Sequence, residues 1–165
     1  MSLEVEVVVE ETAWGDLEGL CGAASAGLAK YLDLPDGCSA VVLGCSDARI
    51  AALNAAFRAK HQATNVLSWP QQDLAANHPG AAPEPPEPDP FDGEIALGDI
   101  ALALETCQRE ADAAGRPFAH HVQHLVIHGL LHLLGYDHIA EEDADLMERL
   151  EVEILATLEI PDPYM

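Results

Sequence analysis

A histidine-rich helix near the C-terminal end of the sequence constrains the fold most strongly. The apolar periodicity over 118–134 predicts a helix, and Gly135 is typical of the residue that follows a helix. His128 and His132 are four residues apart, so their side chains lie on one face of that helix, one turn apart. A glycine lets the backbone turn sharply, and we expect this turn to bring His138 back toward the other two histidines. The fold must therefore place a helix end where three imidazoles meet.

The resulting pattern, HxxxHxxGxxH, indicates a metal site. Two imidazoles at this spacing can reach one ion, and a third completes a ligand set with one open position, which is typical of catalytic zinc. A structural zinc site would need a fourth ligand, for example Cys107 or an aspartate. Only 8 of 165 residues are histidine, so chance would rarely place three histidines and a glycine in this pattern. The pattern therefore disfavours the interpretation that these are ordinary core or surface histidines. Imidazole sites also accept iron, nickel or copper.

Strand and helix patterns alternate irregularly along the rest of the chain. Apolar patterns predict strands over 3–10, 39–44, 64–69 and 94–101. Helical periodicity, with Ser46 as one capping residue, predicts helices over 16–33, 46–60, 102–114 and 140–158. We therefore expect an α+β fold, a single domain over 1–165 in which a small mixed β-sheet packs against helices.

A proline-rich segment at about 71–92 interrupts these patterns. Its run of Pro, Ala, Asp and Glu suits neither a strand nor a helix, so it predicts a mobile, partly extended loop. A loop of this length is usually functional or disordered, and its composition favours disorder.

The chain is strongly acidic, with 7 Lys+Arg against 29 Asp+Glu and a formal net charge of −22. This balance argues against a general nucleic-acid binder, whose affinity comes mostly from neutralising phosphates. Much of the acid is local, however, and we interpret it as a solvated loop around 73–92 and a solvated face on the last helix, the latter formed by Glu141, Glu142, Asp143, Asp145, Glu148, Glu151 and Glu153.

The four cysteines form no CxxC pair and suggest no disulfide framework, so we expect small buried thiols in a reducing compartment. The N-terminus is acidic and lacks the apolar core of a signal peptide. No stretch of about 18 apolar residues is present, which predicts no membrane span. These features together predict a cytoplasmic protein.

The histidine spacing matches that of metzincin peptidases, which place a glutamate directly after the first histidine as the general base. Gly129 occupies that position here. We therefore expect a zincin-like metal helix, while a zinc peptidase of metzincin-like geometry becomes a minor alternative.

The segment His128–His138, HGLLHLLGYDH, reproduces every fixed position of the motif HGxLHLxGYDH and resembles the YbeY family of single-domain bacterial endoribonucleases. The resemblance covers most of the chain from about residue 40, apart from the loop at 71–92. Departures from the family pattern at Ala63, Asn65 and Trp69 are small. Further matching blocks are Leu53-Asn54, Arg58, 64–68, Leu97-Gly98-Asp99-Ile100, Glu105-Thr106, Gln108-Arg109 and Asp162-Pro163-Tyr164.

The resemblance implies an enzyme with one zinc ion that cuts single-stranded RNA, acting in small-subunit ribosomal RNA maturation and ribosome quality control. Implied partners are ribosomal RNA and the ribosome or its proteins, with no role for DNA or membranes. It also implies that His128, His132 and His138 are the zinc ligands and that Arg58 is the functional arginine. An arginine there would stabilise charge developing on the phosphate.

Other residues keep two interpretations. His124 is a proton shuttle or cleft residue, or else a packed residue behind the ligands. Asp137 orients a ligand imidazole or serves the turn. Lys60 is a phosphate guide or simply solvated, and Ser68 faces the cleft without an assigned mechanism. We expect His61, His78, His120 and His121 at the surface.

The acidic charge leaves one alternative of another class open, a ribosome assembly factor that binds without cutting. An acidic enzyme can still cut RNA if its site is locally positive or if a larger assembly presents the substrate. Salt dependence discriminates the two, because direct RNA binding weakens steeply with salt.

Overall fold

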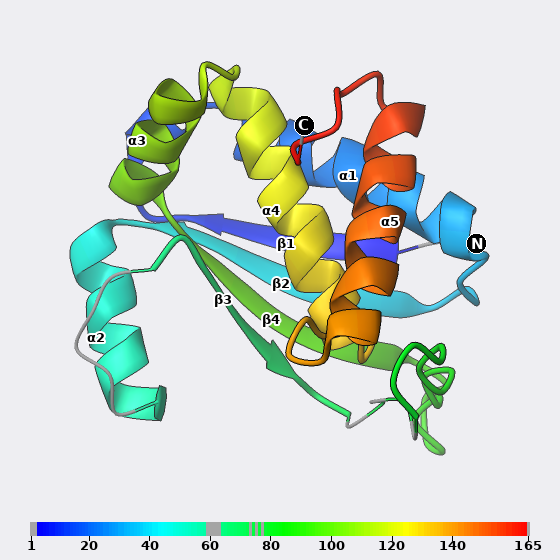
Figure 1. Ribbon diagram of the computed structural model, residues 1–165. Coiled ribbons are helices and arrows are strands. Elements are labelled where there is room, and N and C mark those ends of the chain that lie inside the picture. The colour runs from blue at the N-terminus through cyan, green and yellow to red at the C-terminus, as the bar shows by residue number, and fades with distance from the viewer. Residues whose placement is uncertain (1–2, 59–63, 73, 75, 77, 165) are drawn as a thin grey trace.

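The computed structural model describes residues 3–58, 64–72, 74, 76 and 78–164, with only the backbone described at 57 and 58. Its elements, drawn in Figure 1, are β1 (Leu3–Val9), the short 3₁₀ helix Thr12–Trp14, α1 (Leu17–Leu32), β2 (Cys38–Cys45), α2 (Asp47–Arg58), β3 (Val66–Pro70), β4 (Ile95–Ala103), α3 (Leu104–Ala114), α4 (Phe118–Leu133) and α5 (Glu141–Thr157).

These elements confirm the predicted strands and helices within one or two residues at most ends. The predicted cap at Ser46 is confirmed, because its hydroxyl accepts a hydrogen bond of 3.1 Å from the amide of Arg49. The boundary between β4 and α3 was predicted two residues too early. Leu102 and Ala103 continue the strand because they pair with Gly44 and Cys45 of β2 and are fully buried.

The four strands form a mixed sheet in the order β1-β2-β4-β3 (Figure 1). β1, β2 and β4 are parallel, and β3 pairs antiparallel with β4 at one edge. The predicted α+β fold with a small mixed sheet is therefore confirmed. Pro70 ends the edge strand, where its missing N–H costs no ladder hydrogen bond.

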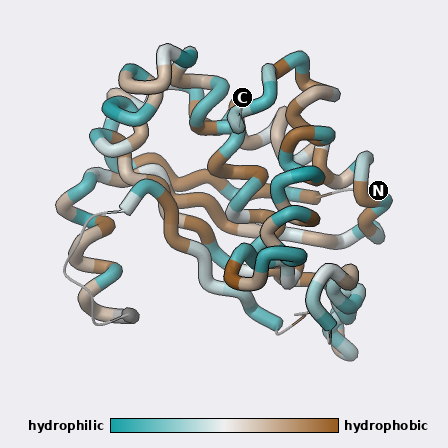
Figure 2. Tube along the Cα trace, in the orientation of Figure 1, coloured by the Kyte–Doolittle hydropathy of each residue, from teal (hydrophilic) through white to brown (hydrophobic). Residues whose placement is uncertain are grey.

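Helices α1, α4 and α5 cover one face of the sheet and enclose the main core with it. The core is largely aliphatic, and Figure 2 shows apolar residues following the strands and the inner sides of these helices. Successive residues of β4 point to opposite faces, so Ile100 and Leu102 join this core while Ala101 and Ala103 join a smaller cluster with Ile50 of α2. α2 therefore packs on the opposite face, near the C-terminal end of β4.

The proline-rich segment contains neither strand nor helix among its described residues, as predicted. It nevertheless contacts the body of the protein. Leu74 is buried, and the amide of Gly80 donates to Asp143 of α5 at 2.8 Å. Within the segment, the amide of Glu84 donates to the carbonyl of Leu74. The mobility of this segment stays a prediction.

All four cysteines are free and buried, which confirms the expected small thiols. Burial raises the pKa of Cys21 and of Cys107 to about 12, so both remain protonated at neutral pH. Among the described residues, no helix is both long and apolar enough to cross a membrane.

Candidate metal centre

The end of α4 places the third histidine. Gly135 has a φ of 103°, its amide donates to the carbonyl of His132, and the amide of Tyr136 donates to the carbonyl of Leu131. This pair of bonds is the Schellman motif, which confirms Gly135 as the residue after the helix. A Cβ at Gly135 would lie 2.6 Å from the carbonyl carbon of Leu74, so glycine is also required by close packing. The chain then turns back toward α4 and delivers His138.

Three histidines converge at this turn. Ligand atoms of His128, His132 and His138 all lie within 4.8 Å of one another. The ring centroids are 4.7 Å apart for His128 and His132, 5.1 Å for His132 and His138, and 5.4 Å for His128 and His138. Burial, together with the neighbouring His128 and His138, lowers the pKa of His132 to about 4. This imidazole is therefore neutral at pH 7, which is the form that binds metals.

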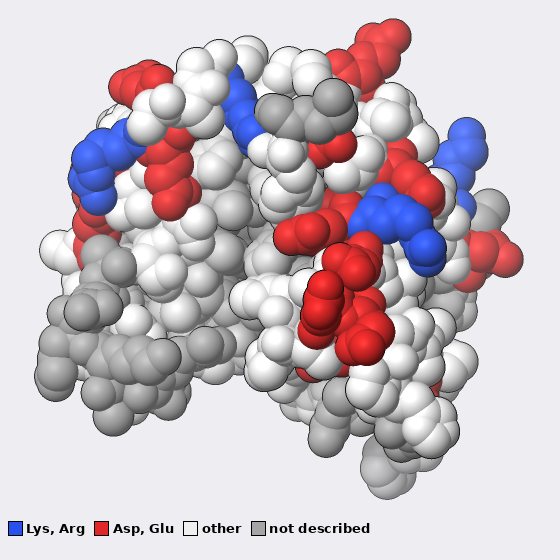
Figure 3. Space-filling view, viewed as in Figure 1, with Lys and Arg blue, Asp and Glu red and all other residues white. Residues whose placement is uncertain are grey.

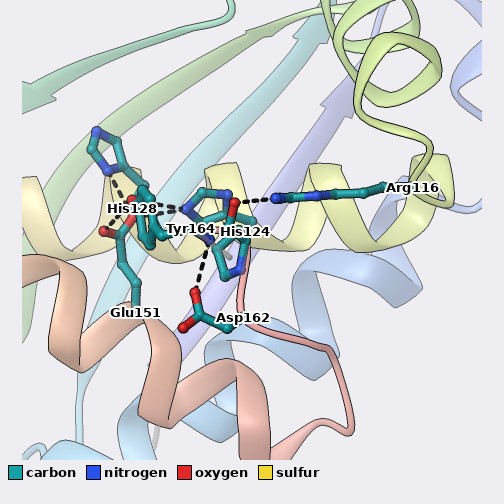
Figure 4. Close-up of polar contacts among 7 residues, drawn as sticks. Arg116, His124, His128, Glu151, Asp162 and Tyr164 are labelled. Atoms are coloured by element: carbon teal, nitrogen blue, oxygen red, sulfur yellow. Dashed lines mark hydrogen bonds and ion pairs between the residues drawn. The ribbon is translucent and has the colours of Figure 1, made fainter.

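A buried carboxylate stands behind the cluster. Glu151 of α5 is 1% exposed, and its Oε1 lies 2.9 Å from Nδ1 of His128 and 3.0 Å from Nε2 of His124 (Figure 4). Burial alone would raise the pKa of Glu151, but the hydrogen bonds with the two histidines outweigh burial and lower it to about 2. A carboxylate that accepts from a ligand histidine is the usual support of a metal site.

Glu151 corrects one prediction. The acidic residues of the last helix were expected to form a solvated face, and Glu141, Glu142, Asp145 and Glu148 are indeed exposed. Glu151 instead lies in the helix register of the buried residues Met147, Leu150, Ile154 and Leu155. An acidic residue in the apolar stripe of a helix is a signal that the sequence did contain.

The C-terminal residues reach the same carboxylate. The hydroxyl of Tyr164 donates to Oε2 of Glu151 at 2.9 Å and lies 3.3 Å from Nε2 of His124. A guanidinium N–H of Arg116 donates to the carbonyl of Pro163, and the amide of Tyr164 donates to Asp162 at 2.7 Å. Figure 4 shows Tyr164 beside His124 and Glu151, with Asp162 and Arg116 holding the tail nearby.

The histidines open onto a cleft of about 700 Å³. β3 and the residues before it form one wall, and the turn after α4 forms another. Asp137 is the one acidic residue among its described lining. Figure 3 shows acidic side chains on α5 and α3. These side chains lie outside the described lining of the cleft.

Gly129 lies between the first two histidines and faces the sheet. A Cβ at this position would lie 2.9 Å from Cδ1 and 3.2 Å from Cγ1 of Ile100 in β4. The helix thus approaches the strand so closely that the position has no room for a glutamate without displacement of Ile100. Glycine at this position supplies no side chain that could act as the general base of a metzincin peptidase.

Other predicted residues are placed as follows. His124 is one turn before His128 but is absent from the described cleft lining, which favours its interpretation as a packed residue behind the ligands. Asp137 accepts from the amide of Ile139 at 3.2 Å, which favours the turn interpretation. Ser68 lines the cleft. His78 is exposed, as predicted.

His121 was wrongly expected at the surface. Its side chain is 11% exposed, and its Nε2 lies 2.9 Å from Glu110 of α3, which also accepts from the side-chain amide of Asn65 at 3.0 Å. His120 is half-buried, with part of the residue at the surface. The side chain of Arg58, at the end of α2, and the residues Lys60 and His61 lie outside the described part of the chain.

Comparison with known proteins gives a consistent result. The family model described as Endoribonuclease YbeY matches residues 10–159. Proteins with this description from Ruegeria pomeroyi and Cereibacter sphaeroides are 58% and 56% identical over 163 residues, covering 98% and 97% of this chain and 98% of each relative. A Thermotoga maritima protein solved in solution has a TM-score of 0.57 at 21% identity, over 94% of this chain and 91% of that protein. The last match concerns the fold alone.

Proposed function

This chain belongs to the YbeY family of endoribonucleases, and on that premise we propose that it cuts single-stranded RNA with the help of one zinc ion held by His128, His132 and His138. The observation that carries the proposal is the convergence of these three imidazoles within 4.8 Å beside a 700 Å³ cleft. The substrate that we propose is small-subunit ribosomal RNA during its maturation and in ribosome quality control, with the ribosome or its proteins as partners.

The residues present fit a metal. Three imidazoles cluster, one of them is neutral at pH 7, and a buried carboxylate supports His128 from behind. Apart from the histidines and Asp137, the described cleft lining carries no ionisable side chain that would supply a fourth ligand. This arrangement favours a catalytic over a structural ion. Bound there, zinc supplies Lewis acidity that polarises a phosphoryl oxygen and acidifies water.

The protein's own groups bind and orient the RNA. β3 and the preceding residues offer backbone and side-chain groups along one wall of the cleft, among them Asn65 and Ser68. Arg58 is the last residue of α2 and precedes β3 in the sequence. We propose that it contacts the phosphate and stabilises the negative charge that develops there. His124 remains our candidate for an indirect role through Glu151.

Two alternatives are weaker. A zinc peptidase would need a base where Gly129 packs against Ile100. A ribosome assembly factor that does not cut RNA suits the net charge of −22, but this function does not explain why three histidines cluster beside an open cleft.

The test is cleavage of single-stranded ribosomal RNA by purified wild type and by the variants His132→Ala and His78→Ala. His78 is an exposed histidine and controls for loss of any imidazole. We expect cleavage by wild type and His78→Ala, its loss with a chelator and its return with zinc. Equal cleavage by His132→Ala, or no cleavage by any protein, would reject the nuclease in favour of the assembly factor.

A further inference from the structure

Glu151 engages both of its carboxylate oxygens. Oε1 contacts two histidines of α4, at 2.9 Å from His128 and 3.0 Å from His124, while Oε2 accepts from Tyr164 at 2.9 Å. The carboxylate is 1% exposed, so water does not compete for it. Three segments far apart in the sequence therefore meet at one side chain (Figure 4).

We propose that Glu151 is the positioning residue for the metal ligand His128, and that the C-terminal Tyr164 holds Glu151 in that position. This inference rests on the proposed metal centre and assigns it a support that includes the end of the chain. The tail would thus belong to the metal site although none of its residues is a ligand.

The hydrogen bonds fix the tautomer of His128. A carboxylate oxygen accepts, so the Nδ1 of His128 that faces it carries the proton. Nε2 is then left with its lone pair and turned away from Glu151, available to the ion. The same acceptor orients His124, whose Nε2 donates to it from one turn earlier on α4. Glu151 therefore selects which nitrogen of His128 binds the metal and restrains the ring.

Tyr164 holds Glu151 through the carboxylate oxygen that the histidines do not contact. Its ring packs edge-on against His124, with centroids 5.6 Å apart at 88°, and its hydroxyl satisfies the carboxylate oxygen that the histidines leave free. Arg116, just before α4, binds the carbonyl of Pro163, and Asp162 accepts from the Tyr164 amide. These contacts hold the tail against α4 and α5 and direct the hydroxyl of Tyr164 at Glu151.

The experiment measures zinc affinity at fixed pH by competition with a chromophoric chelator, for wild type, Glu151→Gln, Tyr164→Phe and Glu148→Gln. Glu148 is exposed three residues earlier on α5 and controls for loss of one negative charge. We expect Glu151→Gln to weaken zinc binding about 10- to 100-fold, Tyr164→Phe to weaken it several-fold, and Glu148→Gln to stay within about twofold of wild type. Long-range ¹H–¹⁵N spectra of the zinc-free proteins should show His128 protonated at Nδ1 in wild type and as a tautomer mixture in Glu151→Gln.

The outcomes separate the two proposals. Wild type that binds no zinc would overturn the metal centre, and this inference with it. Wild type that binds zinc, with Glu151→Gln as tight as Glu148→Gln, would overturn the positioning role alone. If Glu151→Gln shows no cooperative thermal unfolding, that variant is not folded, and the zinc affinity of Tyr164→Phe tests the positioning role instead. Its loss of a single hydroxyl must weaken zinc binding, and unchanged affinity together with an unchanged His128 tautomer would overturn the inference.

Discussion

Asp47 joins the first turns of α2 and α3. Its carboxylate accepts from the amide and hydroxyl of Thr106, both at 2.9 Å, and from Arg109 at 3.1 Å, while its own amide donates to Glu105 at 3.0 Å. Burial would raise the pKa of Asp47, but the hydrogen bonds from Thr106 and Arg109 outweigh burial and lower it. This single residue therefore ties the start of α2, the helix that ends at Arg58, to the start of α3.

The lowered pKa makes this contribution to stability depend on pH. An unfolded aspartate has a pKa of about 3.9, so the stabilisation is complete well above that pH and is lost as pH falls through the lowered pKa of the folded protein. We expect Asp47→Asn to lower the free energy of unfolding at pH 7 by about 1–2 kcal/mol, and the difference from wild type to shrink below pH 4. Urea unfolding across this pH range measures it, with Asp112→Asn, an exposed residue of α3, as the control. A difference that does not change with pH would contradict the assignment.

At the residue scale, spacing alone predicted the three clustered histidines, because i and i+4 positions and a helix-ending glycine are local features. The partner of His121 and the contact between Tyr164 and Glu151 escaped prediction. Their hydrogen bonds join α3 to α4 and the C-terminal tail to α5, and no local pattern specifies such pairs. Glu151 was within reach, since it interrupts an apolar stripe.

At the scale of elements, the turn after α4 does two tasks. It reverses the chain to deliver His138, and it receives the proline-rich segment, whose Leu74 backbone lies against Gly135. The proline-rich segment thereby packs directly against the turn that connects α4 to His138. Replacement at this point should disturb both the stability of the protein and its metal affinity.

We expect Gly135→Ala to lower the free energy of unfolding by about 3 kcal/mol or more, from left-handed backbone strain and the clash with Leu74, and to weaken zinc binding. Gly115→Ala is the matched control. Gly115 also follows a helix with positive φ, but a Cβ there meets nothing within 4 Å. The control should lose only about 1 kcal/mol and keep its zinc affinity. Chemical unfolding and chelator competition compare them, and equal losses for both variants would show that the close packing is unimportant.

The strands and helices were largely predictable from the sequence, because their periodicities are local. The order of the strands in the sheet was not predictable in this way. β4 lies between β2 and β3, so the last strand of the chain is central and β3 returns antiparallel at the edge. That arrangement depends on contacts across the whole chain. The misplaced end of β4 has a similar cause, since pairing with β2 extends the strand through residues that also suit a helix.

On the scale of the whole molecule, few of the described acidic residues lie in the cleft itself. The net charge is −22, yet the described lining of the cleft contains a single acidic residue, Asp137. The chain leads from the cleft directly into α5, because Ile139 lines the cleft and the helix begins at Glu141. The exposed acidic residues in the first two turns of α5, Glu141, Glu142 and Asp145, should therefore repel approaching RNA.

Neutralising them tests this effect. We expect the triple variant Glu141→Gln, Glu142→Gln, Asp145→Asn to raise kcat/KM for single-stranded RNA a few-fold at low salt, and the gain to fade near 0.15 M salt, where the Debye length is about 8 Å. Initial cleavage rates across a salt series measure it, with thermal unfolding as the check on folding. A gain that persists at high salt would point to a local contact instead of long-range repulsion.

The central claim is that three histidines hold one metal ion, and native mass spectrometry tests it most directly. Wild type, His132→Ala and His78→Ala would be loaded with zinc, freed of excess by buffer exchange and weighed intact. The structure leads us to expect one zinc per chain in wild type and His78→Ala and none retained by His132→Ala. Zinc retained equally by His132→Ala, or absent from wild type, would contradict the account.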